Sequence, residues 1–358
     1  MSRLAITISF LIPLLTLSFI SALILNSVSP LSFRQQVIYI LIGLALFFII
    51  SKVDYLLYLF SPWPWYVITV LLLLATLIFG YTTRGSTRWI MIMGQTFQSS
   101  EFIKPLMVIF LSSLLTQKSY PTLLSVIKLL LVFSLPFFLI MRQPDLGSAI
   151  IIAITCLVAL IASGISLKHL LILILIIATI IPIGYSQLMP YQKARIISFI
   201  NPQSDPLGTG YNALQATIAV GSGKLFGRGL GQGTQSHLRF LPEKHSDFIF
   251  AAITEELGFV GGAILISAYL FLSLVLVRAA KNSSSDTGSL ICLISLGLTL
   301  SQAAINIGMN MGLLPITGVT LPFVSSGGSS VVSFFTMMGI CYSVALRTSR
   351  KLVHLEIH

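Results

Sequence analysis

The sequence predicts an all-α polytopic membrane protein with about ten membrane-spanning helices. Of its 358 residues, 56% are hydrophobic and only 9% are charged, and the mean hydropathy is +0.97. A soluble domain of this size carries about 25% charged residues. We find no internal repeat and no soluble segment, so we expect residues 1–358 to form a single membrane domain.

Ten apolar runs support this prediction. A helix needs about 20 residues to cross the hydrocarbon core of a bilayer. A crossing segment is helical because lipid offers no partner to an open backbone N–H or C=O group. The runs lie at about 4–26, 33–51, 63–81, 100–116, 124–141, 144–163, 167–186, 248–278, 287–309 and 328–347.

The positions of Lys and Arg indicate the direction of these helices. An even number of spans puts both termini on one side, and short cytoplasmic connections carry an excess of Lys and Arg. With the N-terminus inside, the inner connections hold Arg3, Lys52, Lys118, Lys168, Arg278, Lys281, Arg347, Arg350 and Lys351, and the short outer ones hold Arg34, Arg84, Arg88 and Arg142. We therefore expect cytoplasmic N- and C-termini and a long extracytoplasmic loop, about 187–246, between helices 7 and 8. The connections near 82–99, 142–145 and 310–327 are then also outside.

Charge and cysteine usage exclude other classes of protein. The net charge of +11 is typical of cytoplasmic loops and headgroup contacts, and no basic cluster resembles a nucleic-acid-binding arm. The partners that it indicates are membrane lipids. Cys156, Cys292 and Cys341 fall inside apolar runs without metal-ligand spacing, so we expect packing residues and no metal site.

The first outer connection, RGSTRWIMIMGQTFQSSEFIKP at 84–105, contains several charges. Trp89 beside Arg88 is typical of an anchor at headgroup level. The stretch is either an interfacial re-entrant piece or a part of a site that includes Arg88. Glu101 and Lys104 are three residues apart, on one face of a helix. They form either a structural ion pair or the charged wall of an outward-facing cavity.

The second outer connection, RQPDLGSA at 142–149, places Asp145 directly after Pro144. A carboxylate at this position can accept from the first N–H groups of the next helix. Asp145 is therefore either a helix N-cap or a group that orients a basic residue of the site.

The long loop at 187–246 is rich in glycine and basic, and its bases include Arg195, Arg228 and Lys244. Glycine backbone can approach a bulky ligand closely, and the positive charge suits a phosphate or pyrophosphate. The alternative is a flexible loop that faces anionic headgroups. GRGLGQG is not a P-loop because no GK[ST] follows it, and GTGYNALQATIAVGSG predicts a short helix lying on the membrane.

The last outer connection, NIGMNMGLLPITGVTLPFVSSGGSS at 306–330, has no charged residue and combines Gly with Pro. Non-helical backbone at membrane depth is tolerated only where it is buried or lines a cavity. The segment is either a simple helix breaker or a re-entrant wall. As a wall, it offers donors to a sugar or phosphate at Ser325, Gly327 and Gly328.

Asp247 lies at the boundary between the long loop and the next apolar run, in FLPEKHSDFIFAAITEELGF at 240–259. It is either a helix N-cap or the carboxylate of a site on the outer surface. In a site, partial burial beside the following apolar residues raises its pKa, and the neighbouring Lys244 opposes that shift. Glu255 and Glu256 are expected to be helix-packing charges.

These segments, in this order, resemble the SEDS family of polytopic membrane proteins (shape, elongation, division and sporulation). The matching stretches are RWI with SEFIKP, QPDLGSA, YQKARIISFINPQSDPLGTGY, GRGLGQGTQSHLRFLPEKHSDFIFAAITEELGFVG and NMGLLPITGVTLPFVSSGG, within about residues 88–328. The LPEKHSDFIFA and LPFVSSGG blocks are long and specific. PITG at 315–318 lacks the Lys common in division members, which favours the RodA-like elongation branch over the FtsW-type division branch.

The resemblance implies a peptidoglycan glycosyltransferase that polymerises lipid II at the outer face of the bacterial cytoplasmic membrane, for cell elongation and rod shape. It also implies a partner, a class B penicillin-binding protein that crosslinks the strands. The essential Asp of the family corresponds to Asp247, and its Glu/Lys pair corresponds to Glu101 and Lys104. Departures from the usual pattern at Ser326, Asn212 and Ala216 leave the acid and the bases in place.

From the resemblance we expect Asp247 to act as a general base on the 4-hydroxyl of the acceptor GlcNAc, which attacks C1 of the donor MurNAc. Undecaprenyl pyrophosphate leaves with inversion, and the cations expected near it are Lys104, Arg195, Arg88 and Arg228. A divalent cation, Mg²⁺ or Mn²⁺, could assist, although no acid cluster demands one. The rival hypotheses are a lipid II flippase or transporter and a non-catalytic scaffold. A transporter would place charges near the midplane, whereas here they gather at the outer boundary.

Overall fold

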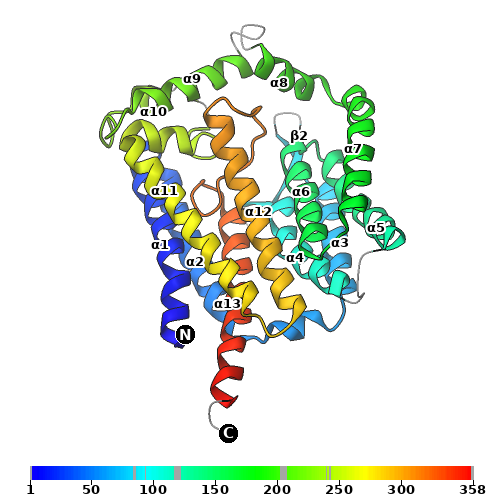
Figure 1. Cartoon of the computed structure of the whole chain (residues 1–358). Coiled ribbons are helices and arrows are strands. Elements are labelled where there is room, and N and C mark those ends of the chain that lie inside the picture. The colour runs from blue at the N-terminus through cyan, green and yellow to red at the C-terminus, as the bar shows by residue number, and fades with distance from the viewer. Residues whose placement is uncertain are drawn as a thin grey trace.

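The computed structural model describes residues 2–83, 86–92, 94–116, 122–201, 208–238, 240–241 and 243–355. Arg84 and Lys118, which were counted for the topology, lie outside them. Helices dominate this part of the chain (Figure 1). They are α1 (Arg3–Val28), α2 (Pro30–Lys52), the 3-10 helix η1 (Tyr55–Leu59), α3 (Trp63–Phe79), α4 (Ser99–Thr116), α5 (Leu123–Arg142), α6 (Leu146–Ala162), α7 (Leu167–Gln187), α8 (Pro190–Ile200), α9 (Thr209–Ser222), α10 (Thr234–His237), α11 (Ile249–Lys281), α12 (Asp286–Asn310) and α13 (Gly328–Leu355).

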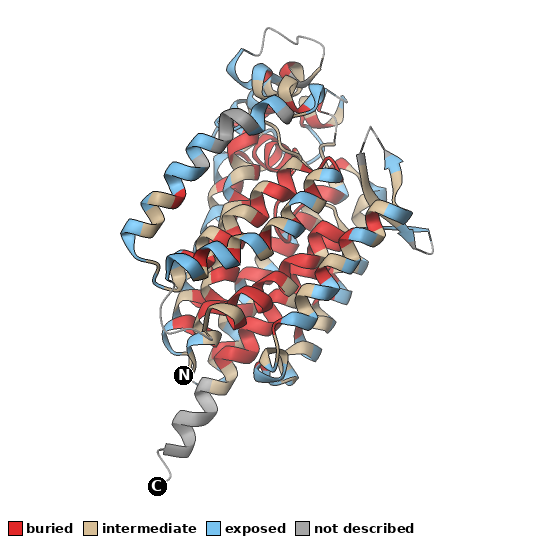
Figure 2. Ribbon diagram, turned by 90° about the vertical axis from the view of Figure 1, so that its right-hand side faces the viewer, coloured by how far each residue is buried: buried red, intermediate tan, exposed pale blue. Residues whose placement is uncertain are grey.

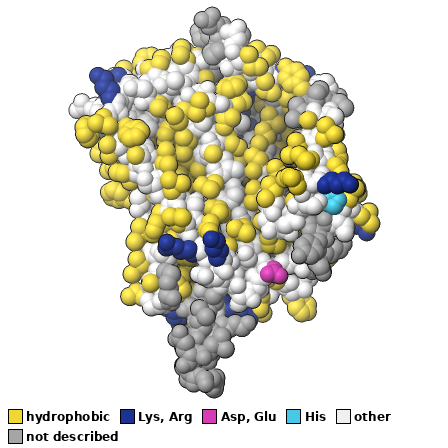
Figure 3. Space-filling model, viewed as in Figure 1, with side chains coloured by type: hydrophobic (Ala, Val, Ile, Leu, Met, Phe, Trp, Pro, Cys, Tyr) yellow, Lys and Arg dark blue, Asp and Glu magenta, His cyan; other side chains and the backbone are white. Residues whose placement is uncertain are grey.

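Seven of the described helices are long and apolar enough to cross a membrane: α1, α2, α4, α5, α11, α12 and the part of α13 up to Arg347. Shorter apolar helices lie at Trp63–Phe79, Leu146–Ala162 and Leu167–Ile176. Hydrophobic side chains cover the middle of the face seen in Figure 3, and charged side chains gather toward its two ends. The prediction of a polytopic, mainly helical membrane protein is therefore confirmed.

Buried residues fill the centre of the helix bundle, as Figure 2 shows. The central helices α4 and α13 are the most buried of the long apolar helices. Close packing of α2 on α13 depends on glycine, because a Cβ added at Gly339 would lie 2.9 Å from the carbonyl oxygen of Phe47. Small residues let helices approach closely where lipid gives no hydrophobic drive for association. Cys156, Cys292 and Cys341 are free and buried, as packing residues should be.

The stretch near Trp89, for which a re-entrant piece was one of two alternatives, forms a small antiparallel sheet in the order β1 (Tyr81–Thr83), β2 (Ser86–Ile92) and β3 (Gln95–Gln98). Ile90 of β2 pairs with Phe97 of β3, and Ile92 pairs with Gln95. The reason is local: β-branched residues at alternate positions and a glycine at φ +78°, Gly94, favour a hairpin over a helix. The sheet leads directly into α4 and thereby fixes where Glu101, in the first turn of that helix, lies along the helix bundle.

The end of the bundle opposite the two termini is covered by α8, α9 and α10 (Figure 1). The expected short helix is thus present as α9. Its Ala216 and Ala219 are buried in a small apolar cluster with Leu241, Phe248 and Ala251. This burial explains why an apolar residue suits position 216. Because the cluster includes Phe248, it also fixes the start of α11 beneath the covering layer.

The long helix α11 is broken at Gly258, whose backbone has φ +69° and ψ −163°. The break frees carbonyl groups that the glycine-rich loop satisfies: the N–H of Arg228 donates to Glu255 O at 2.9 Å, and that of Gly229 donates to Glu256 O at 3.0 Å. A Cβ at Gly227 would lie 2.1 Å from Glu256 O. The glycine at 227 therefore allows close approach to α11, and the expectation that it approaches a ligand is corrected.

Candidate functional site

A cavity of about 410 Å³ lies at the covered end of the bundle and is lined by residues from distant parts of the chain. It is formed by β2, the end of β3, the start of α4, α8, the segment before α11 and the non-helical segment 311–327 with the first turn of α13. Its lining residues are Arg88, Trp89, Gln98, Glu101, Tyr191, Arg195, Glu243, Ser246, Asp247, Gly318, Thr320, Ser326, Gly327, Ser329 and Ser330. The segment 311–327 is therefore a wall and not only a helix breaker.

The sequence-predicted site residues fall into three groups in this geometry. Those that line the cavity are Arg88, Glu101, Arg195, Asp247 and Gly327. Asp145 and Lys104 are buried just behind lining residues, Asp145 against Arg88 and Lys104 against Glu101. The structure does not bring Arg228, Lys244, Ser325 or Gly328 into the lining.

Asp247 precedes α11 and does not cap it. The N-cap position is Phe248, and no side chain caps the helix there, so the carboxylate remains available to the cavity. The backbone carbonyl of Asp247 accepts hydrogen bonds from Asn306 Nδ2 at 3.1 Å and from Asn310 Nδ2 at 3.0 Å. These two amides of α12 hold the residue in place from behind.

The segment that carries Asp247 is also bonded to the non-helical wall. The N–H of Ser326 donates to His245 O at 2.8 Å, and the hydroxyl of Ser325 donates to Ser246 O at 2.6 Å. The side chain of Ser325 is buried and also accepts from the N–H of Leu321 at 2.7 Å. The sequence predicted a backbone donor for a ligand at Ser325, but its N–H donates to Leu321 O at 2.9 Å, so both its N–H and its hydroxyl are used within the protein.

Gly328 and the two outlying bases are likewise occupied elsewhere. A Cβ at Gly328 would lie 2.4 Å from the ring of Tyr39, so this glycine serves helix packing at the start of α13. Arg228 Nη1 donates to Thr234 Oγ1 at 2.9 Å, beside the break in α11. Lys244 Nζ donates to the carbonyl of Ser236. Their expected contact with the ligand is not supported, since none of the three lines the cavity.

The electrostatics of the cavity act on the carboxyl group of Asp247. Burial, with the Glu243 carboxylate as the next contribution, raises its pKa to about 6, and the guanidinium groups of Arg195 and Arg88 oppose this rise. The sequence left the balance between burial and basic charge open; in the structure burial dominates the pKa of Asp247, and the charges that oppose it are these two arginines. A Cβ at Gly318 would lie 3.5 Å from Asp247 Oδ2 and 3.9 Å from Arg195 Nη1, so the acid and the base meet at that glycine.

Asp145 combines both of its predicted roles. Its Oδ1 accepts from the N–H of Ser148 at 3.1 Å and caps α6. The same oxygen lies 3.5 Å from Arg88 Nη1. Gln98 Nε2 and the hydroxyl of Ser100 donate to Oδ2 at 3.1 and 3.2 Å. The buried carboxylate therefore orients Arg88 toward the cavity.

Lys104 is held within the protein. Its Nζ donates to Glu101 Oε1 at 2.5 Å and to Gln302 Oε1 at 2.7 Å, and its side chain is almost completely buried. The expectation that Lys104 contacts a pyrophosphate is therefore corrected, because the cavity is lined by Glu101 in front of it. The ion pair with Glu101 is present as predicted from their spacing.

Sequence reasoning did not identify the amides of α12 that support the site. Gln302, Asn306 and Asn310 follow one another at intervals of four residues, so they share one helix face. All three are buried, and they bond to Lys104, to Asp247 and to Val319 O. Amides at this interval in an otherwise apolar run are a signal that could have identified them.

Residues 1–350 match the family model of the cell cycle proteins FtsW, RodA and SpoVE. The chain is 35% identical over 353 residues to the peptidoglycan glycosyltransferase MrdB of Escherichia coli (strain K12), with 96% of this chain and 94% of that protein covered. It is 37% identical over 326 residues to the stage V sporulation protein E of Bacillus subtilis (strain 168), covering 87% and 86%.

Solved structures share the same fold. One is described as showing structural coordination of polymerization and crosslinking by a peptidoglycan synthase complex, and it matches with a TM-score of 0.82 at 24% identity over 95% of this chain and 97% of that one. The rod shape determining protein RodA of Thermus thermophilus matches with a TM-score of 0.71 at 23% identity over 94% and 95%. The resemblance found in the sequence motifs is thereby confirmed, and the chain belongs to the FtsW/RodA/SpoVE family, the SEDS proteins.

Proposed function

We propose that this protein is a peptidoglycan glycosyltransferase of the RodA-like elongation branch, which polymerises lipid II into β-1,4 glycan strands. The observation that carries this proposal is one cavity in which a carboxylate with a raised pKa, Asp247, faces two guanidinium groups, Arg88 and Arg195. Transfer of a sugar from a lipid pyrophosphate needs both components, a base for the attacking hydroxyl and positive charge for the leaving group. Curated relatives that bear this activity in their names support it.

Asp247 is the proposed general base. It takes the proton from the 4-hydroxyl of the acceptor GlcNAc while that oxygen forms a bond to C1 of the donor MurNAc. The bond from C1 to the pyrophosphate oxygen breaks with its electron pair, so undecaprenyl pyrophosphate leaves from the opposite face. The α-linked donor thereby gives a β-linked product. A positioned base of this kind contributes about 10²–10⁴-fold to the rate.

Arg195 and Arg88 are the proposed partners of the pyrophosphate. Within the described residues Arg195 has no carboxylate within 4.0 Å, the distance of an ion pair, so its charge is available for an anion. Asp145 aligns Arg88 from behind. A second cavity of about 140 Å³ shares both arginines and is otherwise mostly apolar, with Leu146 and Ile150 among its lining residues. It suits the first isoprene units of a lipid whose pyrophosphate lies between the two cavities.

The membrane placement follows from this assignment. We assign the ten proposed spans to the seven long apolar helices and to the three shorter ones, and the excess of Lys and Arg favours both termini in the cytoplasm. The cavity then opens on the extracytoplasmic face of the cytoplasmic membrane. The proposed partner is a class B penicillin-binding protein. Among the described residues no group of three or more His, Cys, Asp or Glu side chains could hold a metal, so a divalent cation remains a prediction that rests on the chemistry of the pyrophosphate.

The test is polymerisation of purified lipid II by the folded protein together with its partner. Asp247→Asn keeps the shape of the side chain and removes the base, so the rate should fall by at least about 10²-fold. Asp286→Asn is the matched control, because Asp286 is an exposed carboxylate at the opposite end of the bundle. Glycan synthesis by Asp247→Asn at the rate of the control would refute the proposed role.

A further inference from the structure

Glu101 has one satisfied and one unsatisfied carboxylate oxygen. Oε1 accepts from Lys104 Nζ at 2.5 Å, whereas Oε2 is buried and has no hydrogen-bond partner among the residues that the structure describes. A buried carboxylate oxygen without a donor is costly, and native structures rarely keep one. Glu101 lines the cavity with the rest of its side chain almost completely covered. The missing donor is therefore to be sought on the molecule that enters the cavity.

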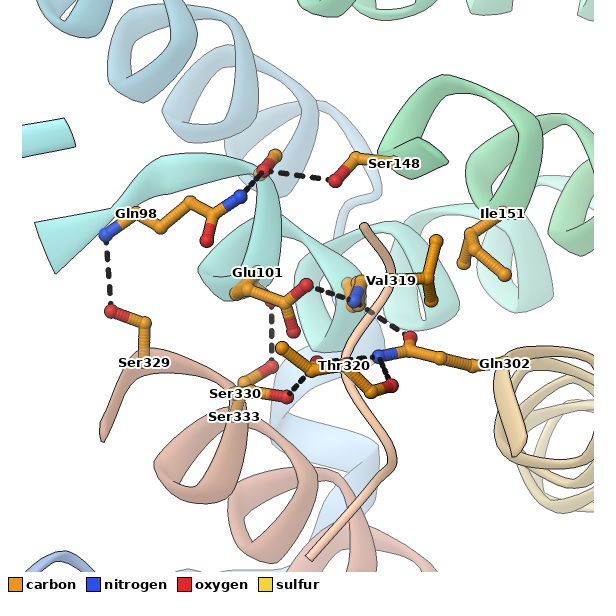
Figure 4. Close-up of polar contacts among 12 residues, drawn as sticks. Gln98, Glu101, Ser148, Ile151, Gln302, Val319, Thr320, Ser329, Ser330 and Ser333 are labelled. Atoms are coloured by element: carbon orange, nitrogen blue, oxygen red, sulfur yellow. Dashed lines mark hydrogen bonds and ion pairs between the residues drawn. The ribbon is translucent and has the colours of Figure 1, made fainter. Parts of the chain in front are cut away.

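The surroundings of Glu101 prevent Lys104 from serving both oxygens. Gln302 Oε1 accepts from Lys104 Nζ at 2.7 Å and holds the ammonium group on one side of the carboxylate. Gln302 itself is anchored, because its Nε2 donates to both the carbonyl and the hydroxyl of Thr320 at 3.0 Å (Figure 4). A hydrogen bond of 2.9 Å joins the Thr320 and Ser330 hydroxyls. The amide thus fixes the lysine and one cavity wall together.

The chemistry of this wall differs from that of the arginines. Beside Glu101 it presents the amide of Gln98 and the hydroxyls of Thr320, Ser329 and Ser330, all neutral groups. A carboxylate oxygen accepts hydrogen bonds and repels an anion, so this wall does not suit a pyrophosphate. It suits uncharged donors, which a sugar supplies as hydroxyl groups and as the N–H of an acetamido group.

We propose that Glu101 Oε2 accepts a hydrogen bond from a hydroxyl or amide N–H of the sugar part of the lipid-linked substrate. Lys104 and Gln302 are positioning residues that hold the carboxylate for this contact and do not touch the substrate. The inference rests on the proposed function and adds a direction to it: the sugar lies at the Glu101 wall, and the pyrophosphate lies at Arg88 and Arg195.

The test compares two lipids with the same undecaprenyl pyrophosphate, of which only lipid II also carries the disaccharide with its stem peptide. Binding of lipid II and of undecaprenyl pyrophosphate is measured on the purified full-length Asp247→Asn protein, in which turnover does not interfere. Adding Glu101→Gln should weaken lipid II binding roughly tenfold or more, the value of a hydrogen bond to a charged group, and leave binding of undecaprenyl pyrophosphate unchanged. Glu101→Gln keeps an oxygen acceptor for Lys104 but removes the counter-charge of this buried ammonium group, so its melting temperature is compared with that of the Asp247→Asn protein.

Gln302 is tested in the same assay. Gln302→Met has a similar volume but removes the contacts of both side-chain amide atoms, so it should reproduce the selective loss of lipid II binding. Gln302→Glu keeps the oxygen acceptor for Lys104, so it should recover part of the lipid II binding. Ser295→Ala is the control, because Ser295 is a buried residue of the same helix whose hydroxyl has no partner in the described part of the chain. Melting temperatures verify that each variant is folded.

The outcomes separate this inference from the proposed function. An equal loss for both lipids would show that Glu101 and Gln302 act only through the fold, and no loss for lipid II would show that Oε2 does not contact the sugar; either result overturns the inference. If the Asp247→Asn protein without further changes binds neither lipid, it is the proposed function that fails.

Discussion

The rate of polymerisation should depend on pH through the carboxyl group of Asp247. Burial, and then the Glu243 carboxylate, raise its pKa to about 6. A general base acts only in its ionised form, so its contribution is lost as the pH falls through 6. About one tenth of these carboxyl groups is ionised at pH 5 and about nine tenths at pH 7. We therefore expect kcat/KM to fall about tenfold between pH 7 and pH 5.

Two substitutions should move this profile in opposite directions. Glu243→Gln removes a negative charge that raises the pKa of Asp247, so the midpoint should move to lower pH. Arg195→Met removes a positive charge that lowers this pKa, so the midpoint should move to higher pH. The plateau rate of Arg195→Met should also fall, because the leaving pyrophosphate loses a cation.

The assay measures initial rates of glycan synthesis from lipid II between pH 4.5 and pH 8 at low substrate concentration. Such conditions report kcat/KM and therefore the pKa of the free enzyme. Protein held at pH 5 and returned to pH 7 must recover its full rate, which separates titration from unfolding. A flat profile between pH 5 and pH 7, or a shift of both variants in the same direction, would refute the reasoning.

Two further predictions concern stability. Lys104→Met leaves the Glu101 carboxylate buried without its partner, so it should lower the free energy of unfolding by about 3 kcal/mol and the melting temperature in detergent. The control, Lys168→Met, changes an exposed lysine and should leave the melting temperature unchanged. Equal effects of the two substitutions would contradict the buried ion pair. Gly258→Ala forces an alanine to adopt a backbone φ of +69°, which costs about 1–2 kcal/mol of stability. Its Cβ would also lie 2.2 Å from the backbone N of Gly227. The substitution should lower both the melting temperature and the activity. Its control is Gly184→Ala, because Gly184 is exposed and has open space around it. A stable and active Gly258→Ala protein would disprove the role of the break.

Hydropathy was sufficient to predict a polytopic helical membrane protein, because the cost of an unpaired backbone group in lipid leaves few alternatives. It was not sufficient for the sheet near Trp89. The same alternation of Ile and Met suits a segment at the membrane surface and a hairpin, and only pairing with Gln95–Gln98 decides between them. The sequence also offered no way to foresee that the glycines of the loop approach α11, since the partner lies about thirty residues further along the chain.

The candidate site was predicted in part for a similar reason. Charge at an outer boundary indicated Asp247, Arg88 and Glu101, because a charge at that depth is rarely without purpose. Local sequence does not tell whether a charged side chain points into a cavity or away from it. Lys104 was therefore expected at the ligand, whereas tertiary packing encloses it between Glu101 and Gln302.

The break at Gly258 has a mechanical consequence. It divides α11 into a long inner piece and a short outer piece, and the outer piece is bonded to the neighbouring loop through the carbonyls of Glu255 and Glu256. Asp247 stands at the start of the outer piece, where Asn306 and Asn310 also hold it. A thinner or thicker bilayer tilts the long helices that cross it. The loop is bonded to both pieces, since the N–H groups of Phe259 and Val260 donate to Lys224 O at 2.8 Å and to Leu225 O at 3.1 Å. Tilting of the long piece would therefore be shared with this loop instead of being confined to Gly258.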